Sequence, residues 1–156
     1  MELLDAHGAA AMAMLRRLCG SRHDADDVFQ ETAARVWRSL PNQPRLRNAR
    51  GWLMTVAYRV FVDSRERRKP HDELSDAPDA RADPPDRAAA RAEVCDRVQA
   101  AIAGLPEPVR EVVVLHYLGG LTISQTAAAM DVREGTVKSR LNAGLGQLRS
   151  ALEGSQ

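Results

Sequence analysis

Residues 121–141 constrain the fold more than any other part of this chain, because they read as a helix, a tight turn and a second helix. Thr122 can cap the first helix, and Gln125, three residues later, has the spacing of a capping box. Ala127 is small enough to let two helices approach closely across a short turn, which Met130 to Val132 would form. The pattern therefore predicts a helix-turn-helix.

The second helix of this stretch has an inward face and an outer face. Apolar residues at helical spacing predict that its inward face carries Val137, Leu141, Leu145, Leu148 and Leu152. The outer face of its first half is short, polar and basic, which suits entry into a DNA major groove. The candidate DNA-contacting residues there are Arg133, Thr136, Lys138, Ser139 and Arg140. A plain helical hairpin with a solvated charged face is the alternative, but the run Thr-Val-Lys-Ser-Arg favours DNA binding.

Composition predicts an all-α protein. Hydrophobic residues make up 44% of the chain but aromatic residues only 4%, so its cores are expected to be aliphatic. Alanine is abundant, and strand-like alternation of β-branched residues is nearly absent.

We see no secretory signal and no stretch near the roughly 20 apolar residues that span a bilayer, so we expect a cytoplasmic protein without membrane insertion. Cys19 and Cys95 lack motif spacing, which indicates reduced thiols, with a regulatory disulfide as the alternative.

Charge and proline divide the chain into segments. Residues 1–70 are basic, with 13 Lys/Arg and 8 Asp/Glu. Residues 71–93 are acidic, with 3 Lys/Arg and 7 Asp/Glu, and residues 94–156 are neutral, with 6 of each kind. The middle segment also contains four prolines once residue 70 is included, and it offers few apolar side chains to bury. We therefore predict two small helical domains joined by an acidic, Pro-containing linker at 70–92. Such a linker reaches about 66 Å when extended, so the domains could sit far apart on a large partner.

The first domain is predicted to contain a helix at 3–19 ended by Gly20 and a second helix at 24–40. Val28, Val36 and Trp37 belong to a wide apolar stripe on the second helix. The opposite face shows Asp26, Asp27, Gln30 and Glu31. These carboxylates could bind a metal, act as an acid–base pair, stabilise the helix dipole or dock a basic partner.

A third helix is predicted at about 49–68, with Asn48 as its cap. Its far end is basic and includes Arg65 and Arg68, while Arg59 lies in its middle. One interpretation is that these basic side chains simply lie in solvent at the helix C-terminus, where the helix dipole favours positive charge. Arginines interleaved with Trp52, Tyr58 and Phe61 also suit a nucleic-acid strand, although most of the large apolar side chains are expected in the core.

The second domain is predicted to begin near residue 92 with a helix that carries Val94, Val98 and Ile102. Pro106 would end that helix, and a further helix at 109–118 would lead to the helix-turn-helix. His116 in this helix is expected to be a packing residue.

Together, the two halves resemble an extracytoplasmic-function (ECF) sigma factor, the compact two-domain type of bacterial transcription initiation factor. The matching motifs of the first half are 24–31 (Asp-Ala-Asp-Asp-Val-Phe-Gln-Glu), 36–38 (Val-Trp-Arg), 52–57 and 63–68. Those of the second half are 105–106 (Leu-Pro), 110–112 (Arg-Glu-Val), 120–122 (Gly-Leu-Thr) and 136–141 (Thr-Val-Lys-Ser-Arg-Leu). The resemblance covers the chain nearly end to end, in the family's order.

The resemblance implies sigma region 2 at 1–69, a linker at 70–92 that threads through the polymerase channel, and sigma region 4 at 93–153. Region 2 would bind core RNA polymerase and melt the minus-ten promoter element, and region 4 would read the minus-thirty-five element. The implied partners are therefore core RNA polymerase, through its β′ clamp helices and β subunit, promoter DNA, and an anti-sigma factor.

The resemblance also implies roles for particular residues. Asp26, Asp27, Gln30 and Glu31 would dock on the β′ clamp helices. The loop 41–51 and the helix after it would hold the non-template strand, and the implied DNA-binding residues of this half are Asn48, Arg59, Arg65 and Arg68. In the second half they are Arg133, Thr136, Lys138, Ser139 and Arg140.

Two positions and the last helix depart from the family pattern. Position 59 is Arg where Asn is common, and position 131 is Asp where Gly is common, although Asp tolerates left-handed geometry. The last helix contains Gly144 and Gly146, each of which costs about 1 kcal/mol relative to alanine, so we expect a softer helix with fewer phosphate contacts.

Two other classes compete with this interpretation. A helix-turn-helix transcriptional regulator, such as a response regulator, would need a receiver domain with strands, and residues 1–70 show none. A small enzyme would have to use Cys19 or Cys95 with His23 or His116, and nothing orders these residues into a nucleophile–base pair. We therefore predict a non-enzymatic protein with no catalytic residues, no metal and no cofactor.

Overall fold

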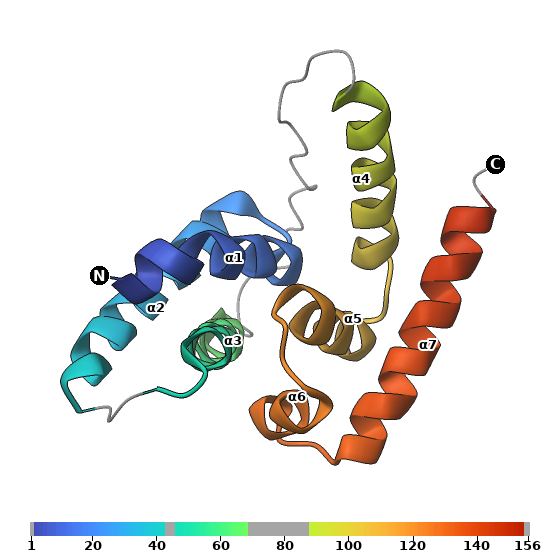
Figure 1. Ribbon diagram of the computed structural model, residues 1–156. Coiled ribbons are helices and arrows are strands. Elements are labelled where there is room, and N and C mark those ends of the chain that lie inside the picture. The colour runs from blue at the N-terminus through green and yellow to red at the C-terminus, as the bar shows by residue number, and fades with distance from the viewer. Residues whose placement is uncertain (1, 43–45, 69–87, 155–156) are drawn as a thin grey trace.

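The computed structural model describes residues 2–42, 46–68 and 88–154, and these residues form helices without strands (Figure 1). The elements are α1 (Glu2–Cys19), α2 (Arg22–Ser39), η1 (Leu40–Asn42), α3 (Ala49–Arg68), α4 (Ala88–Ala103), α5 (Glu107–Val113), η2 (Val114–Leu118), α6 (Ile123–Met130) and α7 (Glu134–Glu153). The all-α prediction is confirmed. The predicted loop at 41–51 is described except for 43–45, and residues 70–87 of the predicted linker at 70–92 lie outside the described residues.

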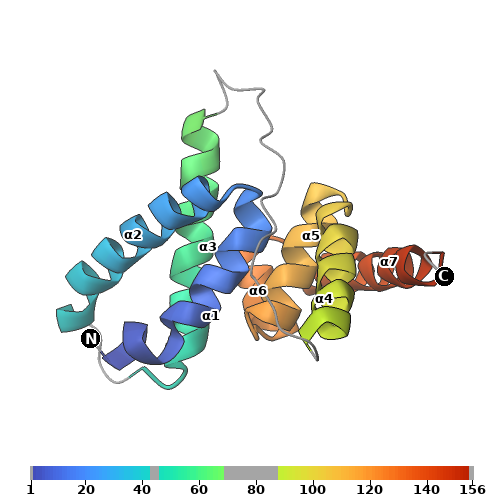
Figure 2. The same cartoon turned by 90° about the horizontal axis from the view of Figure 1, so that it is seen from above.

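Helices α1, α2 and α3 pack on one another as a three-helix unit, which Figure 2 shows beside the remaining helices. Met14, Leu15, Val36, Leu53 and Met54 are fully buried between them. Most side chains of this core are aliphatic or methionine, as the low aromatic content predicts, and Tyr58 and Phe61 are buried in it as well.

Side-chain caps fix where the helices of this unit begin. The Asp24 N–H donates to Ser21 Oγ at 3.1 Å, so α2 begins at Arg22 and not at Asp24 as predicted. The Gly51 N–H donates to Asn48 Oδ1 at 2.9 Å, so Asn48 does cap α3. Gly20 has φ +72°, the left-handed conformation that ends α1.

The helix-turn-helix is formed by α6, a short turn and α7. The Gln125 N–H donates to Thr122 Oγ1 at 3.1 Å, and the Thr122 N–H donates to Gln125 Oε1 at 2.9 Å, so the predicted capping box is present. Asp131 adopts φ 53°, ψ 48° after Met130, so aspartate takes the left-handed position of the turn. Ala127 is buried at the contact between the two helices, as its small size predicts.

The helix before this motif is not regular. It begins at Glu107, directly after Pro106, and its last turn widens into the π-helix η2. There the Gly119 N–H donates to Val114 O at 2.9 Å, five residues back. Gly120 then has φ +71°, which turns the chain toward α6.

Three large apolar side chains are exposed, namely Trp37 (63%) of the apolar stripe on α2, Val94 (57%) on α4, and Leu145 (41%), which was predicted to face inward. The apolar stripe of α2 is wider than the area that α1 and α3 cover, so Trp37 stays in solvent. Helices α4 and α7 extend past α5, so their far ends have few neighbours (Figure 1). The prediction that Leu145 lies in the core is wrong, because the buried face of α7 runs through Val137, Leu141 and Gly144, and Leu145 lies beside that face.

Gly144 is buried where α7 crosses α5. A Cβ atom at this position would lie 2.7 Å from Val113 Cγ2 and 3.0 Å from Val109 Cγ1. Glycine is therefore needed at 144 for the helices to approach, which the sequence pattern did not indicate.

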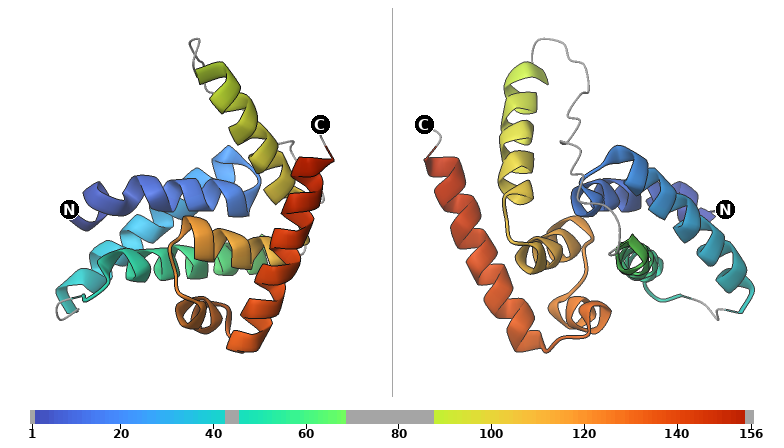
Figure 3. Two further views of the ribbon diagram at one scale, coloured as in Figure 1. Left: turned by 45° about the vertical axis from the view of Figure 1, so that its right-hand side comes forward. Right: turned by 180° about the vertical axis from the view of Figure 1, so that it is seen from behind.

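The two halves of the chain pack directly against each other. Val114, Leu115 and Leu121 belong to the same buried cluster as the core of α1–α3. Arg50 Nη2 also donates to Leu118 O at 3.1 Å. Figure 3 shows α1 and α3 lying alongside α5 and α6 from both sides. None of the described helices is long and apolar enough to cross a membrane.

Candidate nucleic-acid and partner interfaces

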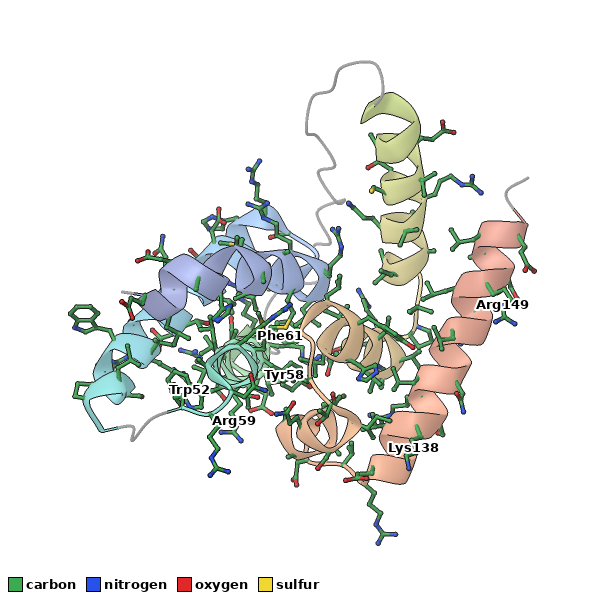
Figure 4. The ribbon with its side chains drawn as sticks, in the orientation of Figure 1. Trp52, Tyr58, Arg59, Phe61, Lys138 and Arg149 are labelled. Carbon is green, nitrogen blue, oxygen red and sulfur yellow. The ribbon has the colours of Figure 1, made fainter. Side chains whose placement is uncertain are left out.

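The first candidate surface is the outer side of the N-terminal half of α7. Arg133 is the exposed N-cap residue, Lys138 and Ser139 are exposed, and Thr136 and Arg140 are partly buried. These side chains share the first turns of a 20-residue helix, and Figure 4 shows Lys138 near its N-terminal end. An exposed helix start with basic and hydroxyl side chains offers donors to phosphates and base edges.

The second candidate surface is on α3. Arg59 is exposed, and Figure 4 shows it on a different side of α3 from Tyr58 and Phe61, which lie toward α5. Tyr58 is 3% and Phe61 7% exposed, so both rings belong to the core in this conformation. Trp52 is partly buried. Of the positions predicted on this helix, Arg59 is thus open to solvent, whereas Tyr58 and Phe61 are covered.

Arg65, a predicted DNA-binding residue, is held by carboxylates of α5. Its Nη1 pairs with Glu111 Oε1 and with Glu107 Oε1. Burial disfavours the cation, but the hydrogen bond and the charge of Glu111 outweigh it, so the pKa of Arg65 is raised. The Tyr58 hydroxyl donates to the other Glu111 oxygen at 2.5 Å, and burial with this hydrogen bond raises the pKa of Tyr58. The sequence indicated the basic helix end but not this pairing.

Arg68 and Asn48 are also engaged within the chain. Arg68 Nη1 lies 2.5 Å from Asp24 Oδ1, and its Nη2 lies 4.0 Å from Asp27 Oδ2. The amide oxygen of Asn48 caps α3, while the residue as a whole is exposed. The basic end of α3 therefore carries positive charge and also holds α3 against α2 through these ion pairs.

The predicted polymerase-docking residues follow one side of α2. Asp27 and Gln30 are exposed, and Asp26 and Glu31 are partly buried. Glu31 accepts a hydrogen bond from Arg35 Nε at 2.9 Å, which lowers the pKa of its carboxyl group. Arg35 also pairs with Asp63 of α3 at 2.8 Å, so this face is fixed to the rest of the unit. Among the described residues, no group of His, Cys, Asp or Glu is arranged to hold a metal ion.

Within the described ranges, Cys19, Cys95 and His116 lie in different surroundings, and no hydrogen bond pairs a cysteine with a histidine. Cys19 is partly buried, and burial, followed by the charge of Asp24, raises its thiol pKa to about 12. A thiolate is therefore disfavoured at this position. His116 Nδ1 lies 2.7 Å from Leu121 O, which fits the predicted packing role. Cys95 is exposed on α4.

Family models match both halves of the chain. Residues 3–70 match sigma-70 region 2, and residues 95–148 match sigma-70 region 4.

Curated relatives match nearly the whole chain. It is 34% identical over 157 residues to the ECF RNA polymerase sigma factor SigE of Mycolicibacterium smegmatis, covering 97% of this chain and 60% of SigE. The chain thus spans less than two thirds of that relative. It is 32% identical over 162 residues to the ECF RNA polymerase sigma factor SigL of Mycobacterium tuberculosis, covering 97% of this chain and 87% of SigL.

Two solved structures share the fold. CnrH, solved with the cytosolic domain of CnrY, superposes with a TM-score of 0.67 at 24% identity, covering 99% of this chain and 88% of CnrH. The sigma factor RpoE of Bartonella quintana, solved with the anti-sigma factor NepR, superposes with a TM-score of 0.71 at 22% identity. The match covers 93% of this chain and 91% of RpoE.

Proposed function

This chain belongs to the ECF RNA polymerase sigma factors, and from that premise we propose how its two halves divide promoter recognition. The factor directs RNA polymerase to promoters. We assign sigma region 2 to residues 1–69, the linker to 70–92 and sigma region 4 to 93–153. The ranges matched by the two family models support this division.

The exposed polar face of α7 is the observation that carries the proposal. Region 4 reads the minus-thirty-five element with Arg133, Thr136, Lys138, Ser139 and Arg140. Lys138 and Ser139 are exposed on the second helix of a helix-turn-helix whose first helix is held by a complete capping box. This geometry allows the start of α7 to enter the major groove.

Region 2 binds the minus-ten element with α3 and the loop before it. Arg59 is free to contact the strand, while Arg65 and Arg68 contact phosphates after exchanging their carboxylate partners. Asn48 keeps its capping role and presents its remaining amide group to DNA. The side of α2 that carries Asp26, Asp27, Gln30 and Glu31 docks on the β′ clamp helices of core polymerase.

An anti-sigma factor is the further partner that we propose. The sigma factor RpoE, which shares this fold, was solved with an anti-sigma factor, and this supports a similar partner here. We place the protein in the cytoplasm, where core polymerase acts, and assign it no enzymatic activity.

A run-off transcription assay tests this function. Core polymerase with the purified protein is expected to produce specific transcripts from a genomic promoter pool, whereas core polymerase alone gives none. The absence of any specific transcript would contradict the sigma-factor function. Specific DNA binding without core polymerase and without transcription would favour a helix-turn-helix transcriptional regulator instead.

A further inference from the structure

Arg35 of α2 binds two carboxylates that belong to different helices. Its Nε donates to Glu31 Oε1 at 2.9 Å, one turn back on α2, and its Nη1 donates to Asp63 Oδ2 of α3 at 2.8 Å. Both distances are typical of charge-assisted hydrogen bonds. One planar guanidinium thus ties Glu31, which lies on the proposed polymerase-docking side of α2, to the neighbouring helix α3.

This pairing leaves one carboxylate oxygen of Glu31 available to a partner. Arg35 binds Oε1, and Arg38 Nη2 approaches the same oxygen at 3.7 Å. Among the residues that the structure describes, none forms a hydrogen bond with Oε2. The Glu31 side chain is 41% exposed, so Oε2 can accept a hydrogen bond from a partner surface while Oε1 stays held.

Holding Glu31 in one orientation lowers the cost of binding a partner. A free glutamate side chain has several rotamers and loses that freedom when it enters an interface. The hydrogen bond from Arg35 restricts the rotamers when the protein folds, so less freedom is lost on docking. The same hydrogen bond, with the charge of Arg35, lowers the pKa of Glu31, so the carboxylate stays ionised.

Asp63 makes Arg35 a fixed support rather than a mobile one. An exposed pair of residues four apart on one helix holds its side chains only weakly. Here the guanidinium is also anchored on α3, and the hydrogen bonds with Asp63 and then Glu31 raise the pKa of Arg35. Asp63 lies one turn after Arg59, the exposed residue assigned to the promoter strand. The docking side of α2 is therefore tied to the proposed strand-binding helix.

We propose that Arg35 is a positioning residue for polymerase docking, which holds Glu31 in the orientation that core polymerase binds and anchors it to α3 through Asp63. This inference rests on the proposed function, because it takes Glu31 as a docking residue. A residue that acts only through a second residue has no effect once the second is removed. The effects of substituting Arg35 and Glu31 on core binding should therefore not be additive.

A double-mutant cycle on core polymerase binding tests the proposal. The full-length protein carries a fluorescent dye on Cys95, an exposed thiol in the other half of the chain, and anisotropy measures its affinity for core polymerase. The variants are Arg35→Ala, Glu31→Gln and their combination. Arg16→Ala is the charge-matched control, because Arg16 is exposed on α1. Circular dichroism checks that each variant is folded.

Arg35→Ala and Glu31→Gln are each expected to weaken core binding at least about threefold relative to Arg16→Ala, and the combined variant is expected to match Glu31→Gln within about twofold. If Arg35 only supported the fold, the two losses would multiply to about ninefold. Multiplied losses, or unchanged or tighter binding by folded Arg35→Ala, would overturn the proposal.

Asp63→Asn decides the matter if Arg35→Ala does not fold. It removes the anchor on α3 at nearly constant size and leaves the hydrogen bond between Arg35 and Glu31 in place. It is expected to weaken core binding in the wild-type background and to have no further effect in Glu31→Gln. Equal losses in both backgrounds, or no loss in either, would reject the positioning role.

A parallel run-off reaction with wild-type protein keeps the two proposals separate. If it gives no transcript, the sigma-factor function fails, whereas the cycle still decides whether Arg35 acts through Glu31 on core binding. If it gives transcripts and Glu31→Gln binds core polymerase as tightly as Arg16→Ala, the function stands and the positioning role of Arg35 is rejected.

Discussion

At the scale of single residues, the availability of each basic side chain is decided by its neighbours. Arg59 and Lys138 are exposed, whereas Arg65 and Arg68 are ion-paired with carboxylates of other helices. An exposed cation can exchange solvent for a phosphate at little cost, but a paired one must first lose a partner. Arg59 and Lys138 are therefore expected to contribute most directly to DNA binding.

Replacing Lys138 tests this expectation. Lys138→Ala is expected to weaken binding of the holoenzyme to a promoter fragment that the run-off assay identifies. The slope of log affinity against log salt concentration should also fall in magnitude by about 1, because one phosphate contact is lost. The measurement is a salt titration of binding by anisotropy. Arg149→Ala is the control, since Arg149 is exposed on the same helix but lies near its opposite end (Figure 4). A slope that changes equally in both variants would mean that Lys138 has no special position on DNA.

Sequence reasoning identified the basic residues of α3 but not their partners. Glu107 and Glu111 lie 42 and 46 residues away from Arg65 in the chain, and no local pattern links them. The capping box at Thr122 could be predicted because its two members are three residues apart and its geometry depends only on the local backbone. Side-chain pairing across domains depends on how the helices pack, which periodicity does not encode.

At the scale of elements, the crossing of α7 over α5 depends on Gly144 and not on the nearby Gly146. Gly144 lies in the contact with Val109 and Val113, whereas nothing lies within 4 Å of a Cβ atom built at Gly146. Helical periodicity correctly predicted which face of α7 holds Val137 and Leu141. It placed Leu145 in the core because Leu145 follows Leu141 by four residues, but the buried face of α7 instead runs through Val137, Leu141 and Gly144 to the partly buried Leu148, and Leu145 lies beside it.

The two glycines therefore predict opposite effects on stability. Gly144→Ala is expected to destabilise the protein by about 1–3 kcal/mol, because the added methyl group overlaps two valine side chains of α5. Gly146→Ala is expected to stabilise it by about 0.5–1 kcal/mol, because alanine loses less conformational freedom in a helix. Chemical denaturation of both variants measures the difference. Changes of the same sign in the two variants would contradict the crossing of α5 and α7 described above.

At the scale of the whole molecule, the two halves of the chain, each with a proposed DNA-binding surface, share buried contacts. The composition predicted two domains and an acidic segment between them, and the reach of that segment would allow the halves to sit far apart on a large partner. The described residues instead form an interface in which Leu115 and Leu121 pack with the core of α1–α3. A linker limits the distance between domains but does not oppose their association, so its sequence could not reveal this interface.

Shared burial predicts that the two halves unfold together when polymerase is absent. Leu115 is fully buried in the cluster that joins them, so Leu115→Ala should lower the free energy of unfolding by about 2–5 kcal/mol. Hydrogen exchange should show that this substitution in the C-terminal half reduces protection in α1 and α3, because cooperative units lose protection together. Leu145→Ala, at a side chain that is 41% exposed, is the control and should change protection little. If Leu115→Ala reduced protection only in α4–α7, the halves would be independent units, and the interface would contribute little to the stability of the free protein.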